Sequence, residues 1–417
     1  MKNSNSMWRV KATLFIMAGT ATTHLGLSSG LAEMAKHFSD ASPTQIQLVS
    51  SIPTLVMLPV ALLASSLVQY FSKKKIALFA YAWSTLFSLG PLFLDNLTAI
   101  IICRALVGLG TGLAMPTTGT ILYDFFEGQE RSRMMGFQSA FSSFGTMVWA
   151  FIGGLLANIH WRATFLITLA TAISFVVVLF WLPDKGKSPK FSSVKKEGSY
   201  GRMLGTFLFF GGCMALFSMF YIAYTMNIAM YMDASGMGNA TVSGLMTSIK
   251  NLGGFLMGLT FGWLCLKFKN FTIGFAYLGP LIGFAMLLTT HSVPVVVISS
   301  FLVGSGLPIM MSRMNWELST IIPLAFMPMA NAIVQSCNSL GNFLSPIVLN
   351  WGASKFLPDT QLQRGVFTLS LGGLACLAIG LLIRAAINTK KGRFMPDAKS
   401  PDSIGGEQPA EAKAEEA

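Results

Sequence analysis

The chain is built from apolar runs of about twenty residues, and this feature restricts its fold more than any other. A helix needs roughly 20 apolar residues to cross the hydrocarbon core of a bilayer. The runs are continuous and do not alternate with polar residues, which favours membrane-spanning helices. About twelve such segments follow one another along the chain. Their predicted limits are 11–32, 46–69, 76–95, 98–122, 135–158, 163–182, 203–231, 240–266, 271–290, 293–312, 323–351 and 366–387.

The composition of the chain points to the same class of protein. Of its 417 residues, 53% are hydrophobic and only 11% are charged, and the mean hydropathy is +0.60. A soluble domain needs more charge than this to cover its surface. We therefore predict an all-α integral membrane protein with about 12 transmembrane helices. The sequence contains no nucleotide-binding loop, metal-ligand cluster or nucleophile–base arrangement, so we expect neither an enzyme nor a bound cofactor or metal.

The positive charges lie mainly in the segments that connect the predicted helices. The net charge is +12, with 29 Lys and Arg against 17 Asp and Glu. Most of the Lys and Arg fall in alternate connecting segments, which the positive-inside rule places in the cytoplasm. The rule predicts a multi-pass protein of the cytoplasmic (inner) membrane with both termini cytoplasmic. It also accounts for the net charge without nucleic acid as a partner.

The predicted helices divide into two groups. The longest internal polar stretch, residues 183–202, separates residues 1–182 from residues 203–387, and a polar tail predicted to be disordered covers 388–417. The two groups share short matches in the same order, separated by roughly 200 residues. The matched positions are Lys73 with Lys267, Gly108 with Gly304, Gln138 with Gln335 and Arg162 with Arg364. We therefore predict two pseudo-symmetric six-helix bundles with a substrate site between them.

Three motifs resemble those of a known family. They are Arg104-x-x-x-Gly108-x-Gly110-x-Gly112, Asp124-x-x-x-x-x-Glu130-Arg131-x-x-x-x-Gly136 and Trp161-Arg162-x-x-Phe165. Together with the predicted spans, they resemble the major facilitator superfamily over residues 8–388, and most of all its drug-and-metabolite efflux (drug:proton antiporter) branch. The resemblance implies transport by alternating access. The gating residues that it implies are Lys73, Lys74, Lys75 and Arg131.

The sequence departs from the family pattern at two places. The loop between the second and third predicted helices keeps its basic run but has Gln69 where the family has a gating aspartate. In the fifth predicted helix, Trp149 and Ala150 replace the central Gly-Pro of the antiporter-associated motif. These changes weaken the proton antiport that the efflux branch implies.

Few ionisable residues fall within the predicted helices. They are His24, Arg104 and Lys250, whereas the acidic residues lie at helix ends or in loops. A charge inside a membrane span is costly, so each of the three is a candidate functional group. We expect Lys250 to face a cavity, and Arg104 either to bind a substrate carboxylate or to bond with backbone carbonyls. His24, on one face with Thr20 and Ser28, either carries a coupling proton or bonds with a neighbouring helix.

Amide side chains form a row on one predicted helix. Asn331, Gln335, Asn338 and Asn342 recur at i, i+4, i+7 and i+11, which places them on one face. Amides that faced lipid would lack hydrogen-bond partners, so this face must look inward. We assign Gln335 to the cavity and Asn342 to contacts between helices. Asn331, Asn338 and Gln138 complete the predicted substrate and coupling set.

Glycines recur along the same helices. Gly108, Gly110, Gly112 and Gly145 are assigned to helix packing and movement, because small residues let membrane helices approach and slide. Alternating access needs such relative movement of the two halves around a central site.

These patterns predict a monomeric secondary active transporter in the lipid bilayer. It moves a small organic compound by alternating access, and proton-coupled efflux is the leading hypothesis. Because cations alone lie within the predicted spans, the second hypothesis is proton-linked uptake of an organic anion. A membrane sensor that has lost transport is the third, since the gating loop is altered.

Overall fold

The computed structural model describes residues 4–126, 128–186, 200–289, 292–321 and 327–390, and within these ranges it forms helices and no strand. The elements of the first part are α1 (Ser4–Thr20), the 3-10 helix η1 (Thr23–Gly30), α2 (Leu31–His37), α3 (Pro43–Leu67), α4 (Lys73–Phe93), α5 (Leu97–Phe125), α6 (Gly128–Ile159), the 3-10 helix η2 (Trp161–Leu169) and α7 (Ala170–Trp181). Those of the second part are α8 (Tyr200–Ala234), α9 (Ala240–Phe268), η3 (Lys269–Phe271), α10 (Thr272–Thr289), α11 (Val293–Gly304), α12 (Gly306–Ile321), α13 (Met327–Phe356) and α14 (Leu362–Lys390). Most of the predicted linker and tail lies outside the described residues.

The fold class predicted from the apolar runs is confirmed. Within the described ranges, nine helices are long and apolar enough to cross a membrane. Each predicted segment coincides with one helix or with a run of consecutive helices. The predicted segments that are not among the nine are 11–32, 240–266 and 323–351. These three contain His24, Lys250 and the amide row of residues 331–342, whereas Arg104 lies in a segment that is among the nine. The segments that carry most of these polar residues are therefore the ones least suited to contact lipid.

The first predicted span is not a single helix. α1 ends at Thr20, and the chain continues as η1 and the short helix α2. Close packing against α6 accompanies the break, because a Cβ on Gly26 would lie 2.6 Å from the carbonyl oxygen of Trp149. Ser29 Oγ also donates to the carbonyl oxygen of Ala150 at 2.9 Å. The 3-10 helix is narrower than an α-helix, which allows this close approach. The break depends on a tertiary contact, which hydrophobic periodicity does not reveal.

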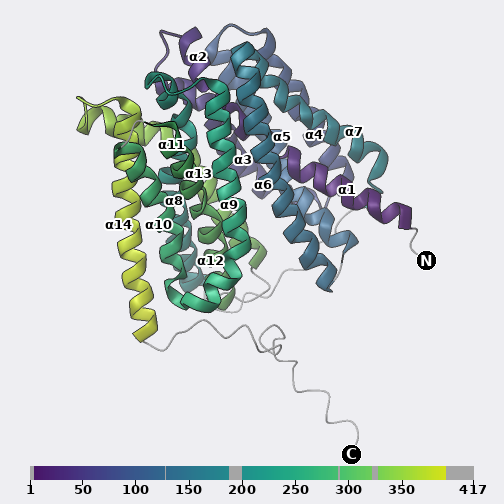
Figure 1. The fold of residues 1–417 in the computed structure, drawn as a ribbon. Helices are drawn as coiled ribbons and strands as arrows, with labels where there is room; N and C mark the ends of the chain where they lie inside the picture. Colours follow the sequence, from purple (N-terminus) through teal and green to yellow (C-terminus); the bar gives the residue numbers. More distant parts are fainter. Residues whose placement is uncertain (1–3, 127, 187–199, 290–291, 322–326, 391–417) are drawn as a thin grey trace, which may run out of the picture.

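The helices form two groups that stand beside each other in Figure 1. α1 and α3 to α7, coloured purple to blue, occupy one side, α8 to α14, coloured teal to yellow, occupy the other, and α2 lies at the top of the view. Each group has its own hydrophobic core, which includes Leu14 and Tyr81 in the first and Phe217 and Tyr277 in the second. The two groups are therefore separately packed units.

The two groups contact each other through polar residues at the end that carries α2. Lys36 Nζ forms an ion pair with the Asp233 carboxylate at 2.6 Å. Gln47 donates to Asn227 at 2.9 Å and accepts from Asn350 at 3.0 Å, and all three amides are buried. These five residues define the closed end, and the opposite end, where α1 begins and α14 stops, is the termini end. The ribbons of the two groups diverge towards the termini end (Figure 1).

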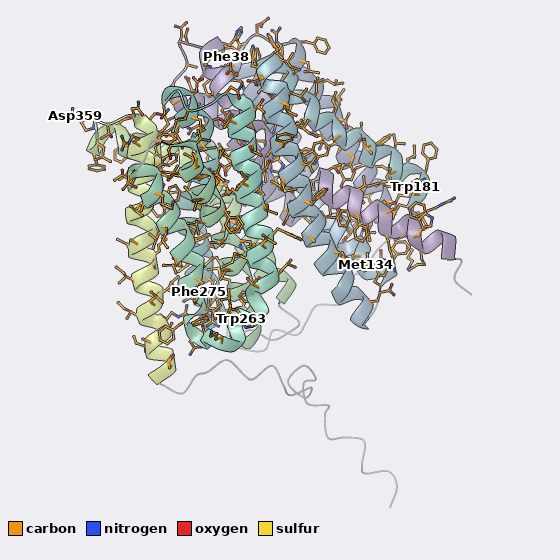
Figure 2. The ribbon with its side chains drawn as sticks, in the orientation of Figure 1. Phe38, Met134, Trp181, Trp263, Phe275 and Asp359 are labelled. Atoms are coloured by element: carbon orange, nitrogen blue, oxygen red, sulfur yellow. The ribbon has the colours of Figure 1, made fainter. Side chains whose placement is uncertain are left out.

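Apolar side chains from both groups also pack together at the closed end. This shared core includes Leu31, Ile46 and Trp161 from the first group and Ile222 and Met226 from the second. In Figure 2, Phe38 marks the end of the molecule where this core lies, and Trp263 and Phe275 lie towards the opposite end. Apolar packing therefore joins the two groups at this end in addition to the polar contacts.

At the closed end, α6 and α9 cross with their backbones in contact. A Cβ on Gly154 would lie 2.5 Å from the Ala240 carbonyl oxygen and 3.0 Å from the Cα of Gly244. A Cβ on Gly244 would lie 2.6 Å from the Ala150 carbonyl oxygen. Any side chain at either position would push the two groups apart, because backbone atoms cannot rotate out of the way.

The Lys36–Asp233 ion pair predicts a pH dependence of the closed end. The hydrogen bond to Asp233 raises the pKa of Lys36. A raised pKa contributes stability that is complete below the ordinary lysine pKa and is lost as the pH rises through the raised value. Because the two side chains are 51% and 35% exposed, solvent screening limits this contribution to about 1 kcal/mol or less. Glu33, 3.0 Å from Lys36 Nζ, retains part of it when Asp233 is removed.

We expect Asp233→Asn to loosen the closed end slightly at neutral pH and to have no effect above the raised pKa of Lys36. The measurement is the rate at which a thiol reagent modifies Ala229→Cys, a position in the shared core that is 1% exposed. An effect of Asp233→Asn that is equally large at high pH would show that the lysine charge is not involved.

Candidate functional site

A cavity lies between the two groups of helices. The centres of water-sized molecules can occupy about 240 Å³ of it. η1 and α6 line it on one side, and α8, α9, α11, α12 and α13 line it on the other. Both groups therefore contribute to one space.

Lys250 of α9 carries the charge of this cavity. Its Nζ donates to Thr225 Oγ1 at 2.6 Å and lies 4.2 Å from the centroid of the Tyr221 ring and 6.0 Å from that of Tyr224. The residue is only 4% exposed. A cation–π contact contributes about 0.5–2 kcal/mol, much less than the hydration that a buried ammonium loses. Of the described residues that line the cavity, none is an Asp or Glu, so the ammonium has no anionic partner there.

Amides and hydroxyls supply the other polar groups of the lining. Asn338 and Asn342 of α13 and Asn251 of α9 face the cavity from one group, and Ser142 and Thr146 of α6 face it from the other. Asn338 Oδ1 accepts from the Ser218 hydroxyl at 2.6 Å, which leaves its amide nitrogen as the group able to donate to a ligand. The hydroxyls of Ser142 and Thr146 already donate to backbone carbonyl oxygens. The ammonium and the amide nitrogens are therefore the donors that the lining offers to a ligand with acceptor oxygens.

The rest of the lining is apolar. It includes Leu25, Ile222, Phe255, Leu307 and Pro308. A ligand that fills the cavity therefore meets a charged and polar region next to a hydrocarbon wall. Such a mixture is typical of sites for small organic molecules, where apolar contact provides affinity and a few polar groups fix orientation.

Arg104 lies outside this lining. It is fully buried in α5, and its Nε donates to the carbonyl oxygen of Val49 in α3 at 3.1 Å. Its Nη1 and Nη2 have no hydrogen-bond partner within the part of the chain that the structure describes. Of the two roles expected for Arg104, the contact with a backbone carbonyl is the one present in this conformation.

His24 also lies outside the lining, although its neighbour Leu25 belongs to it. The ring is buried in η1, with Nδ1 3.2 Å from the carbonyl oxygen of Ala21. This contact is with the turn that precedes η1, so the expected bond to a neighbouring helix is not the one present in this conformation.

The predicted amide row reaches the cavity only in part. Asn338 and Asn342 line it, whereas Gln335 is exposed and does not. Asn342, which was assigned to contacts between helices, therefore lines the cavity, and Gln335, which was assigned to the cavity, does not. Gln335 lies nearer the start of α13, on the termini side of the cavity. Gln138 is half-buried one turn before Ser142 and is not part of the lining. The side chain of Asn331 lies outside the described residues.

The predicted packing glycines all lie at close helix contacts. A Cβ on Gly108 would lie 2.7 Å from the Pro53 carbonyl oxygen, and one on Gly112 would lie 2.9 Å from the Val60 Cβ, both in α3. Gly110 faces the opposite helix, α4, where a Cβ would lie 2.6 Å from the Ala80 carbonyl oxygen. Gly145 meets the backbone of Gly19 in α1. In α5, the glycines thus alternate between two neighbouring helices.

The basic run after α3 ties the termini end of the first group together. Lys73 Nζ lies 2.5 Å from the Asp124 carboxylate at the end of α5. Lys74 Nζ donates to the carbonyl oxygen of Leu179 in α7 at 2.9 Å. Lys75 is exposed. The side chain of Arg131 lies outside the described residues, so its predicted gating role stays a prediction.

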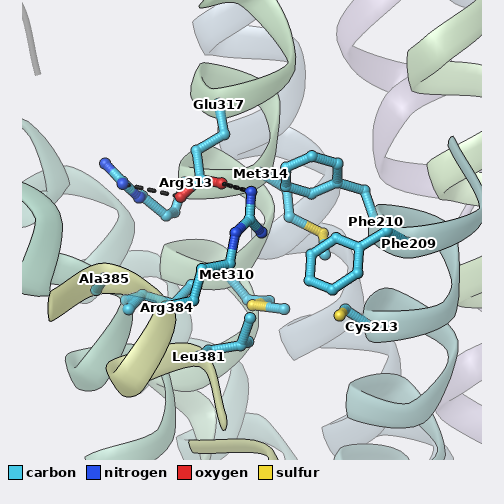
Figure 3. A pocket seen from close by; sticks show the side chains of 11 residues that line it. Phe209, Phe210, Cys213, Met310, Arg313, Met314, Glu317, Leu381, Arg384 and Ala385 are labelled. Atoms are coloured by element: carbon cyan, nitrogen blue, oxygen red, sulfur yellow. Dashed lines mark hydrogen bonds and ion pairs between the residues drawn. The ribbon is translucent and has the colours of Figure 1, made fainter. Parts of the chain in front are cut away.

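A second, smaller pocket lies towards the termini end of α8, α12 and α14 (Figure 3). Arg313 and Arg384 contact the two carboxylate oxygens of Glu317 at 2.8 and 3.3 Å. The Arg384 guanidinium also lies 4.5 Å from the ring centroid of Phe209 and 4.9 Å from that of Phe210. The centres of water-sized molecules can occupy only about 20 Å³ here. The pocket is therefore a connection between three helices, and it is too small for a substrate.

Sequence patterns did not single out the residues that surround Lys250. Tyr221, Tyr224 and Thr225 are spaced i, i+3 and i+4 in α8, which places them on one face. That spacing could have identified them, but tyrosine in a membrane helix is also a common apolar residue. Gln47, Asn227 and the other polar groups of the closed end gave no signal, because their partners are distant in the chain.

Three comparisons with known proteins bear on this site. The model of the family described as Major Facilitator Superfamily matches residues 12–346. The putative niacin/nicotinamide transporter NiaP of Bacillus subtilis (strain 168) is 25% identical over 157 residues, which are 37% of this chain and 38% of NiaP. The multidrug transporter protein MdtP of the same organism is 30% identical over 86 residues, 20% of this chain and 16% of MdtP. The chain thus matches well under half the length of each relative.

Solved structures show the same architecture. A crystal structure of the nucleoside transporter NupG superimposes with a TM-score of 0.72, and the match covers 90% of this chain and 98% of that one. Sequence identity is only 13%, so this likeness concerns the fold.

Proposed function

The chain belongs to the Major Facilitator Superfamily, and we propose that it is a secondary transporter that carries a small organic anion across the membrane by alternating access. The observation that carries this proposal is the charge of the cavity. Lys250 contributes a cation to the lining, and no described lining residue contributes an acid. Membership of this family also agrees with the expectation that the chain is not an enzyme.

An organic anion supplies the charge that the cavity lacks. A carboxylate next to Lys250 would form a charge-assisted contact, of a kind that contributes about 1.5–3 kcal/mol. Asn338, Asn342 and Asn251 add donors for further oxygens, and the apolar wall accommodates a carbon skeleton. NiaP is named for niacin, a small ring that carries one carboxylate, and for nicotinamide, its neutral amide, so it supports a small ring compound as cargo, and the choice of an anion rests on Lys250.

The closed end supports the alternating-access part of the proposal. Ion-paired, amide and backbone contacts join the two groups there, while their ribbons diverge at the termini end (Figure 1). We propose that residues 1–182 and 203–387 move as the two halves of a monomer. With the positive-inside rule placing both termini in the cytoplasm of an inner-membrane protein, the conformation described here faces inward.

Proton-coupled efflux is the second candidate. Two observations favour export. MdtP is named as a multidrug transporter, and the motif around Arg104 resembles that of the efflux branch. His24, which is buried in η1, is the candidate carrier of the coupling proton. In reconstituted vesicles, an imposed proton gradient that drives acid into the proton-poor side would support symport, and acid movement against the proton flow would support efflux.

Thermal-shift measurements on the purified full-length protein test the cargo class. Each ligand is offered as a carboxylic acid, a primary amide and an amine on the same skeleton, beginning with nicotinate and nicotinamide. We expect stabilisation by acids, because a ligand that binds the folded state raises its apparent stability. Equal or greater stabilisation by the amines would sink the proposal of an anionic cargo.

Arg104→Lys separates a structural role of Arg104 from contact with the cargo. Lysine keeps the charge but lacks the Nε donor to Val49, so we expect a loss of stability of about 1–3 kcal/mol. Because Arg104 is outside the lining, we expect the affinity for a stabilising acid to change by less than about threefold. The measurements are thermal unfolding and a ligand titration. A large loss of affinity at unchanged stability would instead place Arg104 on the cargo.

A further inference from the structure

The ammonium of Lys250 is held by neutral groups on every side of the cavity. α8 offers the Thr225 hydroxyl and the Tyr221 ring, and α13 offers the amides of Asn338 and Asn342. Across the cavity, η1 and α6 present apolar groups and hydroxyls. Described acidic residues that pair with cations lie at the two ends of the molecule, as at Asp124 and Asp233. When the halves close around an empty cavity, they therefore bring no negative charge to Lys250.

The position of Lys250 is also fixed by its backbone. A Cβ on Gly304 of α11 would overlap the carbonyl oxygen of Lys250, so the two helices touch at this residue. One turn further along α9, a Cβ on Gly254 would lie 3.0 Å from the Gly304 carbonyl oxygen. Lys250 lies about ten residues, or roughly 15 Å, from the start of α9, so its side chain does not reach the membrane surface from there. The backbone contact with Gly304 therefore keeps Lys250 at the cavity wall.

Closure has opposite consequences for the empty and the loaded cavity. In the empty cavity, closing either buries an ammonium that has no counter-ion or requires that ammonium to release its proton, and both cost free energy. In the loaded cavity, the carboxylate of the cargo neutralises the ammonium, and the closed form encloses no net charge. A bound anion therefore lowers the free energy of closure much more than a neutral ligand does.

We infer that a bound organic anion permits the cavity to close, so that the protein exchanges anions across the membrane much faster than it returns empty. This inference rests on the organic-anion cargo proposed above. In each direction the exchange moves one anion. The charge of that anion neutralises the ammonium while the cavity changes its opening from one side of the membrane to the other. Transport of an anion in one direction therefore depends on a second anion that is carried back in the other direction.

Counter-transport in vesicles tests this directly. Vesicles that contain the full-length protein are loaded with unlabelled nicotinate or with the same concentration of nicotinamide, and labelled nicotinate is added outside. We expect entry at least about tenfold faster into the nicotinate-loaded vesicles. Entry at equal rates into both would overturn the inference while leaving the anionic cargo intact. If labelled nicotinate and the other acids of the thermal-shift series neither bind nor enter, the proposed cargo fails, and this inference fails with it.

A conformational measurement tests the role of the ammonium without transport. Spin labels at Tyr70→Cys and Phe271→Cys, which are 63% and 45% exposed at the termini ends of the two groups, report the distance across the opening once the native cysteines are replaced. Without any acid, we expect Lys250→Met to populate the short, closed distances more than the unsubstituted protein does, and Lys250→Arg to resemble the latter. If Lys250→Met does not fold, Lys250→Gln removes the same charge. Identical distance distributions with and without the lysine charge would overturn the inference.

Discussion

Lys250→Met is expected to weaken the binding of organic acids by about 100-fold, which corresponds to about 2.7 kcal/mol. The substitution removes the ammonium from the cavity but keeps a flexible apolar side chain of similar length. The expected loss lies within the range for a hydrogen bond to a charged group. The measurement is a titration of the purified protein with the acid that stabilises it best. The matched primary amide should lose little affinity, because it makes no charged contact.

The control for this substitution is Lys267→Met. Lys267 also places its Nζ over an aromatic ring, 5.0 Å from the centroid of Trp263, but it lies at the termini end of α9 and outside the cavity lining. The two variants therefore remove the same charge and the same kind of ring contact at different places. Equal losses of acid affinity in both would indicate a general effect of net charge and would contradict a binding role for Lys250.

Gly154→Leu is expected to prevent formation of the closed end and to reduce transport by at least about tenfold while the protein stays folded. The new Cβ would meet the Ala240 carbonyl oxygen and the Gly244 Cα, both backbone atoms of the other group. Overpacking of this kind costs about 1–3 kcal/mol, which disfavours the closed end relative to conformations in which the groups separate there. The modification rate of Ala229→Cys should rise correspondingly, because the shared core becomes accessible.

Gly119→Leu is the matched control. A Cβ on Gly119 of α5 would meet nothing within 4 Å, so a leucine there adds the same atoms to a membrane helix without a collision. Transport and the reactivity of Ala229→Cys should both stay at the level of the unsubstituted protein. If Gly154→Leu leaves the thiol as protected as Gly119→Leu does, the α6–α9 crossing is not required for closure.

Most of the fold could be predicted from the sequence, because bilayer thickness sets a length that the apolar runs must match. The helix contacts of Gly108, Gly110 and Gly112 could also be predicted, because small residues at regular spacing mark close helix contacts. The break at η1 was not, because it depends on the approach of Gly26 to the backbone of α6. Hydrophobic periodicity within one helix carries no information about the surface of the helix that packs against it.

The site was predictable only for groups that are unusual in a membrane span. A lysine in the middle of an apolar helix is conspicuous in the sequence because a charge inside a membrane span costs free energy. Lys250 does line the cavity. Gln335 and Asn342 carry the same chemistry on one face of α13, and only the tertiary position of that helix decides which of them reaches the cavity. Arg104 drew attention for the same reason as Lys250, yet its Nε bonds to a neighbouring backbone.

The central claim is that the cavity carries organic anions, and the flux of an acid compared with its own amide tests it most directly. Vesicles that contain the purified protein are loaded with one unlabelled compound, and entry of the same labelled compound is followed for nicotinate, nicotinamide and further acid–amide pairs. We expect that the acids enter, that their amides enter at the rate of protein-free vesicles, and that Lys250→Met abolishes the difference. Entry of the amides as fast as the acids, or undiminished acid entry through Lys250→Met, would contradict it.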